Sequence, residues 1–355
     1  MHRIIAAIDR VFSRRVTKQN GAILSQYKTN DSGSAFLAPV LPDLESVDRI
    51  IRQQMHSDIA LVGTIAEYII NAGGKRIRPV LVLLIARALG YQGEDHCTLA
   101  ATIEFIHTAT LLHDDVVDEA QLRRGIPSAN VSFGNAASVL VGDFLYTRAF
   151  QMMVSVGNMR ILDVLADATN LIAEGEVMQL THVRNIAVDE GAYMNVIYAK
   201  TAKLFEASCE IGALIAQATD EKVRAAARFG RALGMAFQLI DDVLDYAGDT
   251  GEMGKRIGND LKEGKMTLPL IYLFENGTQQ QKELVRRCVE ENDESCFAAV
   301  SEAVCSCGAL EYTRSKAGQA VAQATQALAV FSGEGSGQYG KSLLELASFS
   351  VERSF

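Results

Sequence analysis

The stretch TLAATIEFIHTATLLHDDVVD, residues 98–118, decides the fold, because its apolar residues recur at spacings of three and four. This period is typical of an α-helix with a buried face. Three carboxylates, Asp114, Asp115 and Asp118, nevertheless stand near its end. A desolvated carboxylate is unfavourable unless a cation or several hydrogen-bond donors compensate it. We therefore expect a helix that carries a cation site.

The same helical period runs through most of the chain. Only five prolines interrupt it, and Ala, Leu, Glu, Gln, Arg and Met dominate the stretches between them, a composition that favours helices. No segment alternates convincingly as a strand would. The expected fold class is therefore all-α, a single large helical bundle. Helices are expected over 58–71, 79–90, 98–118, 135–155, 160–181, 192–218, 221–246, 265–276 and 310–330.

The overall composition excludes several classes of function. The net charge of −9 argues against general nucleic-acid binding, because no basic excess is present to neutralise a phosphate backbone. No apolar run approaches the roughly 18 residues of a membrane-spanning helix, so no transmembrane segment is expected. The six cysteines have no zinc spacing and are expected to be reduced thiols, as in the cytoplasm.

Polar stretches separate the helical segments. Residues 30–43 are typical of a linker, 248–265 of a long Gly-rich polar loop and 332–341 of a late turn. The first nineteen residues have a basic amphipathic pattern, which indicates either a dispensable extension or a segment for targeting or membrane-surface contact.

A second acidic segment repeats the first. In FQLIDDVLDYAGD, residues 237–249, polar residues at i, i+3, i+4 and i+7 share one helical face. They are Gln238, Asp241, Asp242 and Asp245. Such carboxylate sets suit a hard cation with oxygen ligands, and the expected ion is Mg²⁺ completed by water and phosphate oxygens. One such motif alone favours a solvated acidic face, but two copies inside apolar helices favour a metal site.

Two basic clusters provide partners for an anion. GGKRIRP, residues 73–79, places Lys75, Arg76 and Arg78 before or within the first turn of a helix. QLRRG, residues 121–125, follows the first acidic motif and offers two arginines for bidentate phosphate contacts. Together with the acidic pair, these clusters predict a diphosphate site.

In this order, GGKRIRP, LLHDDVVDEAQLRRG, AKT, FQLIDDVLDYAGD and GNDLKEGKMTLPL resemble the trans-isoprenyl diphosphate synthase family. The resemblance runs from about residue 45 to the C-terminus. Within the family it is greatest to bacterial octaprenyl diphosphate synthases, which make the ubiquinone side chain. IEFIHTATLLHDD and FGNAASVLVGDFLYTRAFQMM are especially similar. It implies the isoprenoid synthase fold with a central apolar cavity. The expected division is an N-terminal extension and linker over 1–43 and a catalytic domain over 44–355.

The resemblance also implies roles for individual residues. It implies two or three Mg²⁺ ions that bridge the allylic diphosphate and both motifs, with Asp114, Asp118 and Asp241 as metal ligands. The groups implied in catalysis are Asp114, Asp115, Asp118, Asp241, Asp242, Asp245, Arg123 and Lys200. The isopentenyl diphosphate site is implied at Lys75, Arg78, His107 and Arg124. The allylic diphosphate site is implied at Arg123, Lys200, Thr201, Gln238 and Lys255, with Lys265 in the closing loop.

The implied reaction is ionisation of an allylic diphosphate of the farnesyl type, attack by the isopentenyl double bond and loss of a proton. A homodimer and transient membrane-surface contact during product release are expected. A terpene cyclase would pair one DDxxD with a different second motif, and a di-iron bundle would need Glu-x-x-His motifs. A noncatalytic scaffold has no reason to hold these charges.

Product length is expected to depend on the space below the first acidic motif. Ala109 precedes Asp114 by five residues, roughly 7.5 Å along the helix axis. Because Ala109 and Thr110 are small, a growing tail can pass and the product should be long. Phe150 and Met153, one turn apart, are large enough to stop it deeper, although both residue types also commonly fill cores. Nonaprenyl or geranylgeranyl products remain the alternatives.

Overall fold

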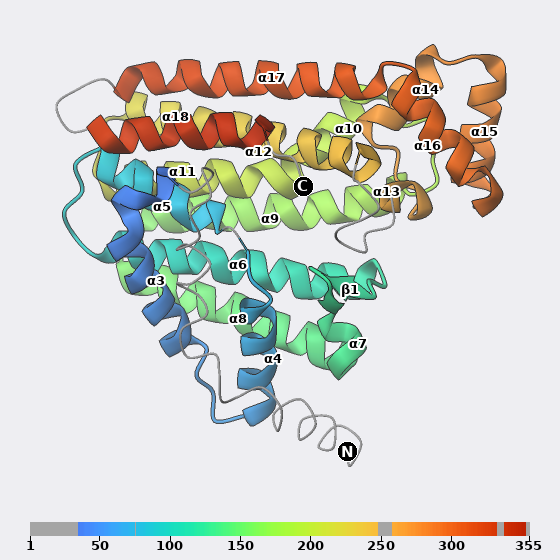
Figure 1. The fold of residues 1–355 in the computed structure, drawn as a ribbon. Coiled ribbons are helices and arrows are strands. Elements are labelled where there is room, and N and C mark those ends of the chain that lie inside the picture. Colours follow the sequence, from blue (N-terminus) through green and yellow to red (C-terminus); the bar gives the residue numbers. More distant parts are fainter. Residues whose placement is uncertain (1–34, 75, 248–257, 332–336, 353–355) are drawn as a thin grey trace.

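The computed structural model describes residues 35–74, 76–247, 258–331 and 337–352. Over these residues the chain is a layered helical bundle, as expected (Figure 1). No helix among them is long and apolar enough to cross a membrane. The 3₁₀ segments are η1 (Ala35–Val40), η3 (Glu294–Cys296) and η4 (Leu328–Phe331), and η2 (Tyr198–Ala202) is a π-helix.

The α-helices, in chain order, are α3 (Leu41–Gln54), α4 (Ala60–Asn71), α5 (Ile77–Ala88), α6 (Asp95–Val117), α7 (Ala129–Phe133), α8 (Asn135–Val156), α9 (Met159–His182), α10 (Glu190–Ile197), α11 (Lys203–Ile215), α12 (Asp220–Ala247), α13 (Asn259–Lys262), α14 (Leu268–Asn276), α15 (Gln279–Glu290), α16 (Phe297–Ser306), α17 (Ala309–Ala327) and α18 (Gly337–Glu352).

Every range that the apolar period predicted is mainly helical, with ends shifted by a few residues, except that 192–218 is not one continuous α-helix. It comprises α10, the π-helix η2 and α11. The period did not predict α3, α15, α16 or α18. One missed signal was local, because Thr278 and Gln281 form a capping box at the start of α15.

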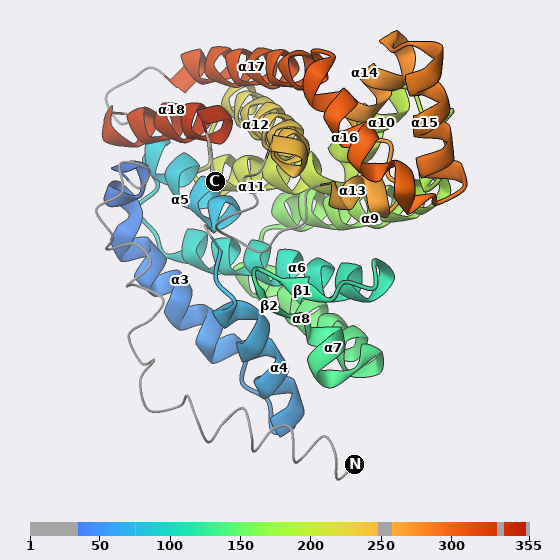
Figure 2. The ribbon, with the colours of Figure 1, turned by 45° about the vertical axis from the view of Figure 1, so that its right-hand side comes forward.

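One short hairpin interrupts the helical pattern of the described residues. Two-residue strands β1 (Leu122–Arg123) and β2 (Ile126–Pro127) pair antiparallel, with Arg123 opposite Ile126. A hairpin this short has too few residues to display an alternating pattern. It lies beside the C-terminal end of α6 in both views (Figures 1 and 2).

Three of the polar stretches are partly helical. The stretch 30–43, expected to be a linker, is helical and packed from residue 35, because Phe36, Leu37 and Val40 are buried in the core. Phe36 also contacts the ring of Phe349 on α18, with ring centroids 5.5 Å apart. Residues 337–341 of the expected late turn belong to α18, and α13 lies within the expected Gly-rich loop.

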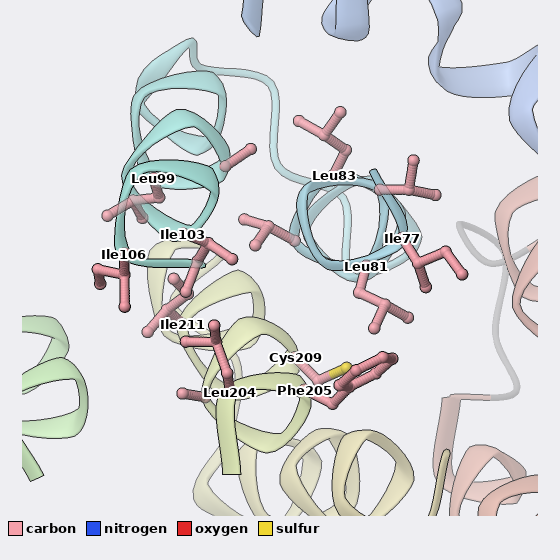
Figure 3. Close-up of a cluster of buried hydrophobic side chains, with 14 of the residues drawn as sticks. Ile77, Leu81, Leu83, Leu99, Ile103, Ile106, Leu204, Phe205, Cys209 and Ile211 are labelled. Atoms are coloured by element: carbon pink, nitrogen blue, oxygen red, sulfur yellow. The ribbon is translucent and has the colours of Figure 1, made fainter. Parts of the chain in front are cut away.

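The main core is centred on α5, α6 and α11. Figure 3 shows Leu81 of α5, Ile103 of α6 and Phe205 of α11 converging between the three helices. Nearly every residue of α5 is buried, which explains its almost continuous apolar sequence. A second cluster surrounds the C-terminal half of α12 and includes α14 to α17. Since α12 contributes to both clusters, its acidic motif is held on a rigid element.

Candidate active site

The three aspartates of the first motif do not share one environment. Asp114 is half-buried on α6, and burial raises its pKa to about 7 while nearby Lys200 opposes this shift. Asp115 is completely buried and accepts hydrogen bonds from Arg123, with Nε at 2.8 and 2.9 Å and Nη2 at 2.5 Å. Asp118 caps the end of α6. The middle aspartate therefore anchors an arginine.

The second motif repeats this division. Asp242 is buried, accepts a short hydrogen bond from the Tyr193 hydroxyl and a 2.9 Å bond from Gln238 Nε2. Burial raises its pKa to about 7, although both hydrogen bonds lower it. Asp245 accepts from the backbone N–H groups of Asn259 at 3.1 Å and Asp260 at 3.2 Å. The second aspartate of each motif thus forms buried hydrogen bonds with other protein side chains, which the spacing alone did not reveal.

The basic groups beside the motifs form one cluster around Arg78 and His107. Arg78 Nη1 donates to His107 Nε2 at 3.0 Å, and the guanidinium carbon lies 4.5 Å from the centre of the Phe205 ring. Burial lowers the pKa of Arg78 to about 10, while Glu104 and Asp241 oppose this shift. Among the described residues, Arg78 Nε has no hydrogen-bond partner. A buried cation with a spare donor suits a phosphate oxygen.

Burial also lowers the pKa of His107 well below its usual value, and the charges of Arg78 and Arg124 lower it further. His107 is therefore neutral in this cluster and able to accept from Arg78. Arg124 lies against the segment before α5, because a Cβ atom built on Gly74 would be 2.6 Å from Arg124 Nη1. Segments about 50 residues apart in the sequence thus converge, as the two basic clusters predicted.

One basic residue does not join this site. Arg76 was expected to converge there with its neighbours, but it is buried and ion-paired with Asp48 of α3. Its backbone has a left-handed conformation with φ +45°, which turns it away at the start of α5. Arg76 therefore joins two helices. Lys75 and Lys255 lie outside the described residues.

The β1–β2 hairpin positions both arginines of QLRRG. Arg123 lies in β1, and Arg124 occupies the turn with φ +51°. The hairpin is tied to α4 because the Tyr68 hydroxyl donates to the Pro127 carbonyl at 2.6 Å. Ser128 Oγ donates to the Ala120 carbonyl at 2.5 Å and closes its base. A short hairpin thus becomes rigid enough to present charged side chains.

The π-helix η2 carries Lys200 and Thr201. π-Helical turns are rare and often occur at functional sites. Thr201 Oγ1 donates to Gln238 Oε1 at 2.9 Å, which extends the hydrogen-bond chain through Asp242 to Tyr193. The close approach of α12 to η2 requires Gly234, since a Cβ there would be 2.6 Å from Ala202 Cα. Sequence reasoning missed Tyr193, because a single tyrosine in an apolar helix carries no motif.

Lys265 completes the described part of the site. Its Nζ lies 3.4 Å from Asp118 Oδ1 and 2.5 Å from Glu263 Oε2. The four residues expected to set product length occupy two packed helices, α6 and α8. Ala109 and Met153 are buried in the core, whereas Thr110 and Phe150 are partly exposed. Their role in setting product length stays a prediction.

The oxygen-rich donor set fits a divalent cation. Asp114 needs positive charge nearby to be fully ionised, since burial raises its pKa to about 7. Among the described residues, the one group of three potential ligands within 4.8 Å of one another is Asp43, His96 and Cys97. Asp43 there is already held by Arg87 at 2.6 and 2.8 Å. An ion at Asp114, Asp118 and Asp241, which are not in that group, would need further ligands, as water and phosphate oxygens would supply.

Comparison with known proteins agrees with this geometry. The family described as Polyprenyl synthetase matches residues 59–306, more than half of the chain. The chain belongs to the polyprenyl synthetase family. It is a prenyltransferase with the all-α isoprenoid synthase fold. The resemblance predicted from the motifs is therefore confirmed.

Individual relatives of this polyprenyl synthetase are similar to it over nearly their whole length. It is 49% identical over 312 residues to octaprenyl diphosphate synthase of Escherichia coli, covering 88% of this chain and 96% of that protein. A polyprenyl synthase from Caulobacter crescentus, complexed with calcium and isoprenyl diphosphate, superposes with a TM-score of 0.86 at 42% identity, covering 91% and 98% of the two chains. A decaprenyl diphosphate synthase from Rhodobacter capsulatus gives 0.84 at 42%, covering 89% and 98%.

Proposed function

We propose that this prenyltransferase condenses isopentenyl diphosphate units onto an allylic diphosphate of the farnesyl type and releases octaprenyl diphosphate for a quinone side chain. One observation carries the proposal. The two acidic motifs lie next to two distinct cation groups, Arg78 with Arg124 and Lys200 with Lys265. Two diphosphate substrates require two such groups.

We assign the isopentenyl diphosphate to the group formed by Arg78, His107 and Arg124. The neutral His107 accepts a hydrogen bond from Arg78 and so fixes the orientation of its guanidinium. The other N–H groups of Arg78 are then held in place for a phosphate oxygen. Lys75 is proposed as a further contact by resemblance. Arg124 belongs to a hairpin tied down at Pro127, which favours a preorganised anion site.

We assign the allylic diphosphate to the second group. Its members are Arg123, Lys200, Thr201, Gln238 and Lys265, with Lys255 by resemblance. Asp115 fixes Arg123 with hydrogen bonds to both carboxylate oxygens, so the guanidinium is oriented before substrate arrives. Thr201 and Gln238 hold each other at 2.9 Å. This rigidity favours binding without a further cost of ordering the side chains.

Asp114, Asp118 and Asp241 would hold two or three Mg²⁺ ions. The C. crescentus relative was crystallised with calcium, another divalent cation that takes oxygen ligands. When bound, Mg²⁺ neutralises the diphosphate and makes it a better leaving group. Asp242 and Asp245 would act indirectly, by fixing α12 and the segment around α13.

The protein side chains then stabilise charge as it develops. Arg123, Lys200 and Lys265 interact with the departing diphosphate, and their attraction increases as the carbon–oxygen bond breaks. The isopentenyl double bond attacks the allylic cation, and the proton lost from the adduct goes to the released diphosphate. Apolar helix faces exclude water that would otherwise capture the cation.

Product length, assembly and location are also proposed. Small Ala109 and Thr110 leave the tail path open, with Phe150 and Met153 as the deeper limit. A homodimer is supported by exposed apolar residues on one side of α8, where Leu140 and Val154 are 67% and 65% exposed. All six cysteines are free, in agreement with a cytoplasmic setting. Transient membrane-surface contact would serve release of a long product.

The test is one assay with two readouts. Farnesyl diphosphate, isopentenyl diphosphate and Mg²⁺ should give Mg²⁺-dependent release of diphosphate and an extractable linear octaprenyl chain. A cyclic hydrocarbon would instead indicate a cyclase. A linear product of nine or four isoprene units would support the proposed reaction but replace the proposed chain length. Absence of diphosphate release from the intact, folded dimer would leave only the scaffold alternative.

A further inference from the structure

Glu176 lies in the segment EGEVMQL of α9, which belongs to none of the motifs that predicted the site. Its Oε2 accepts a hydrogen bond from Lys200 Nζ at 2.6 Å. The two side chains are only 25% and 21% exposed, respectively. A lysine–carboxylate pair this close and this shielded restricts the lysine much more than an exposed pair does.

The backbone is built to bring the two residues together. Gly175, the residue before Glu176, packs against η2. A Cβ at this position would be 2.8 Å from Ala199 Cβ and 2.9 Å from the backbone nitrogen of Lys200. Any larger residue would push α9 away from the π-helix. The backbone of α9 at Glu176 therefore lies close to the backbone of η2 at Lys200.

The neighbouring lysine provides an internal comparison. Lys203, three residues later, pairs with Glu206 of its own helix at 2.7 Å, with exposed fractions of 14% and 13%. Lys200 instead crosses to a different helix and to the side of Asp114. Both Lys200 and Glu176 lie close enough to Asp114 for their charges to interact with its carboxylate. Glu176, Lys200 and Asp114 thus form one cluster of interacting charges.

We propose that Glu176 is a positioning residue that holds the Lys200 ammonium beside the first acidic motif, ready for the allylic diphosphate. An ammonium has three donors, and the bond to Glu176 uses one, so two are left for phosphate oxygens. Without Glu176 the four-carbon side chain of Lys200 samples many rotamers, and binding must restrict them. The inference rests on the proposed function, since it takes Lys200 as an allylic diphosphate contact.

The experiment compares steady-state kinetics of the full-length Glu176→Ala and Glu176→Gln variants. Glu176→Ala should raise KM for farnesyl diphosphate about 3- to 10-fold, on the scale of immobilising one long side chain. Glu176→Gln keeps an acceptor oxygen and should show a smaller rise. KM for isopentenyl diphosphate should stay unchanged in both, because Arg78, His107 and Arg124 form the other cation group.

The matched control is Glu206→Gln, which removes an ion pair of similar length and burial outside the site. It should leave both KM values unchanged. In a Lys200→Gln background, Glu176→Ala should add no further rise, because the group it positions is gone. Equal shifts in Glu206→Gln and Glu176→Ala, or an unchanged KM in Glu176→Ala, would overturn the inference. An inactive wild type would instead overturn the proposed function.

Discussion

Lys265 Nζ lies 3.4 Å from Asp118 Oδ1, although the two residues are 147 positions apart in the chain. Asp118 ends α6, and Lys265 follows α13, so this contact joins the two segments that carry the first acidic motif and the expected closing loop. Burial alone would lower the pKa of Lys265, but the carboxylates of Glu263 and Asp118 raise it above its usual value. The lysine is therefore a permanent cation beside the first acidic motif.

Replacing Lys265 with Met should raise KM for the allylic diphosphate. A hydrogen bond to a charged group contributes about 1.5–3 kcal/mol, which corresponds to an increase of about 10- to 150-fold. Steady-state kinetics at saturating isopentenyl diphosphate measures this. Lys262→Met, on α13, is the control and should have little effect. Equal losses in both variants would mean that the segment needs positive charge in general.

Asp114→Ala and Asp241→Ala should each lower turnover at least about 100-fold, the scale of losing one group that stabilises developing charge. Far-ultraviolet circular dichroism should be unchanged, because both side chains lie outside the apolar core. Asp143→Ala changes a carboxylate that is 59% exposed on α8; it is the control and should retain full activity. Wild-type turnover in either purified motif variant would refute the metal assignment.

Asp115→Asn should behave differently from Asp114→Asn. Because it breaks a buried contact with Arg123, we expect the free energy of unfolding to fall by about 1–3 kcal/mol, as measured by urea denaturation. The Mg²⁺ concentration for half-maximal activity should change little. Asp114→Asn should show the reverse, near-normal stability and a raised Mg²⁺ requirement. If both variants alter the Mg²⁺ requirement equally, Asp115 is also a ligand.

Ala109→Tyr should shorten the main product to three or four isoprene units, and Met153→Ala should lengthen it beyond eight. Ala109 is completely buried, so a tyrosine fits only if space for a tail exists beside it. Without that space the variant is overpacked and loses about 1–3 kcal/mol of stability. Chromatography of dephosphorylated products gives the length. An unchanged long product from a stable Ala109→Tyr enzyme would show that the tail takes another path.

Deleting residues 1–34 should leave activity and stability unchanged, whereas deleting residues 1–40 should not. The longer deletion removes Phe36, Leu37 and Val40, each buried, and burial of such a side chain contributes about 1.5–3 kcal/mol. Thermal unfolding of the two truncated proteins distinguishes them directly. Equal loss in both would place structural interactions before residue 35.

Much of this protein was predictable from local sequence. The apolar period of three and four predicted the long helices, because one turn of helix is 3.6 residues and each helix must bury one face. The spacing of Gln238, Asp241, Asp242 and Asp245 predicted a shared face of one helix for the same reason. The two basic clusters were expected to converge, and Arg124 of one does lie against Gly74 of the other. That they bind an anion stays a prediction.

Only the tertiary structure decided which member of each motif faces the site. Asp115 and Asp242 have the same residue type as their neighbours and differ in what packs against them, an arginine from a hairpin and a tyrosine from α10. In the same way, Arg76 is ion-paired with Asp48, and Lys200 with Glu176. These partners are 8 to 49 residues away in sequence. Helical periodicity determines a direction within one helix, whereas the packing between helices determines what charge each side chain meets.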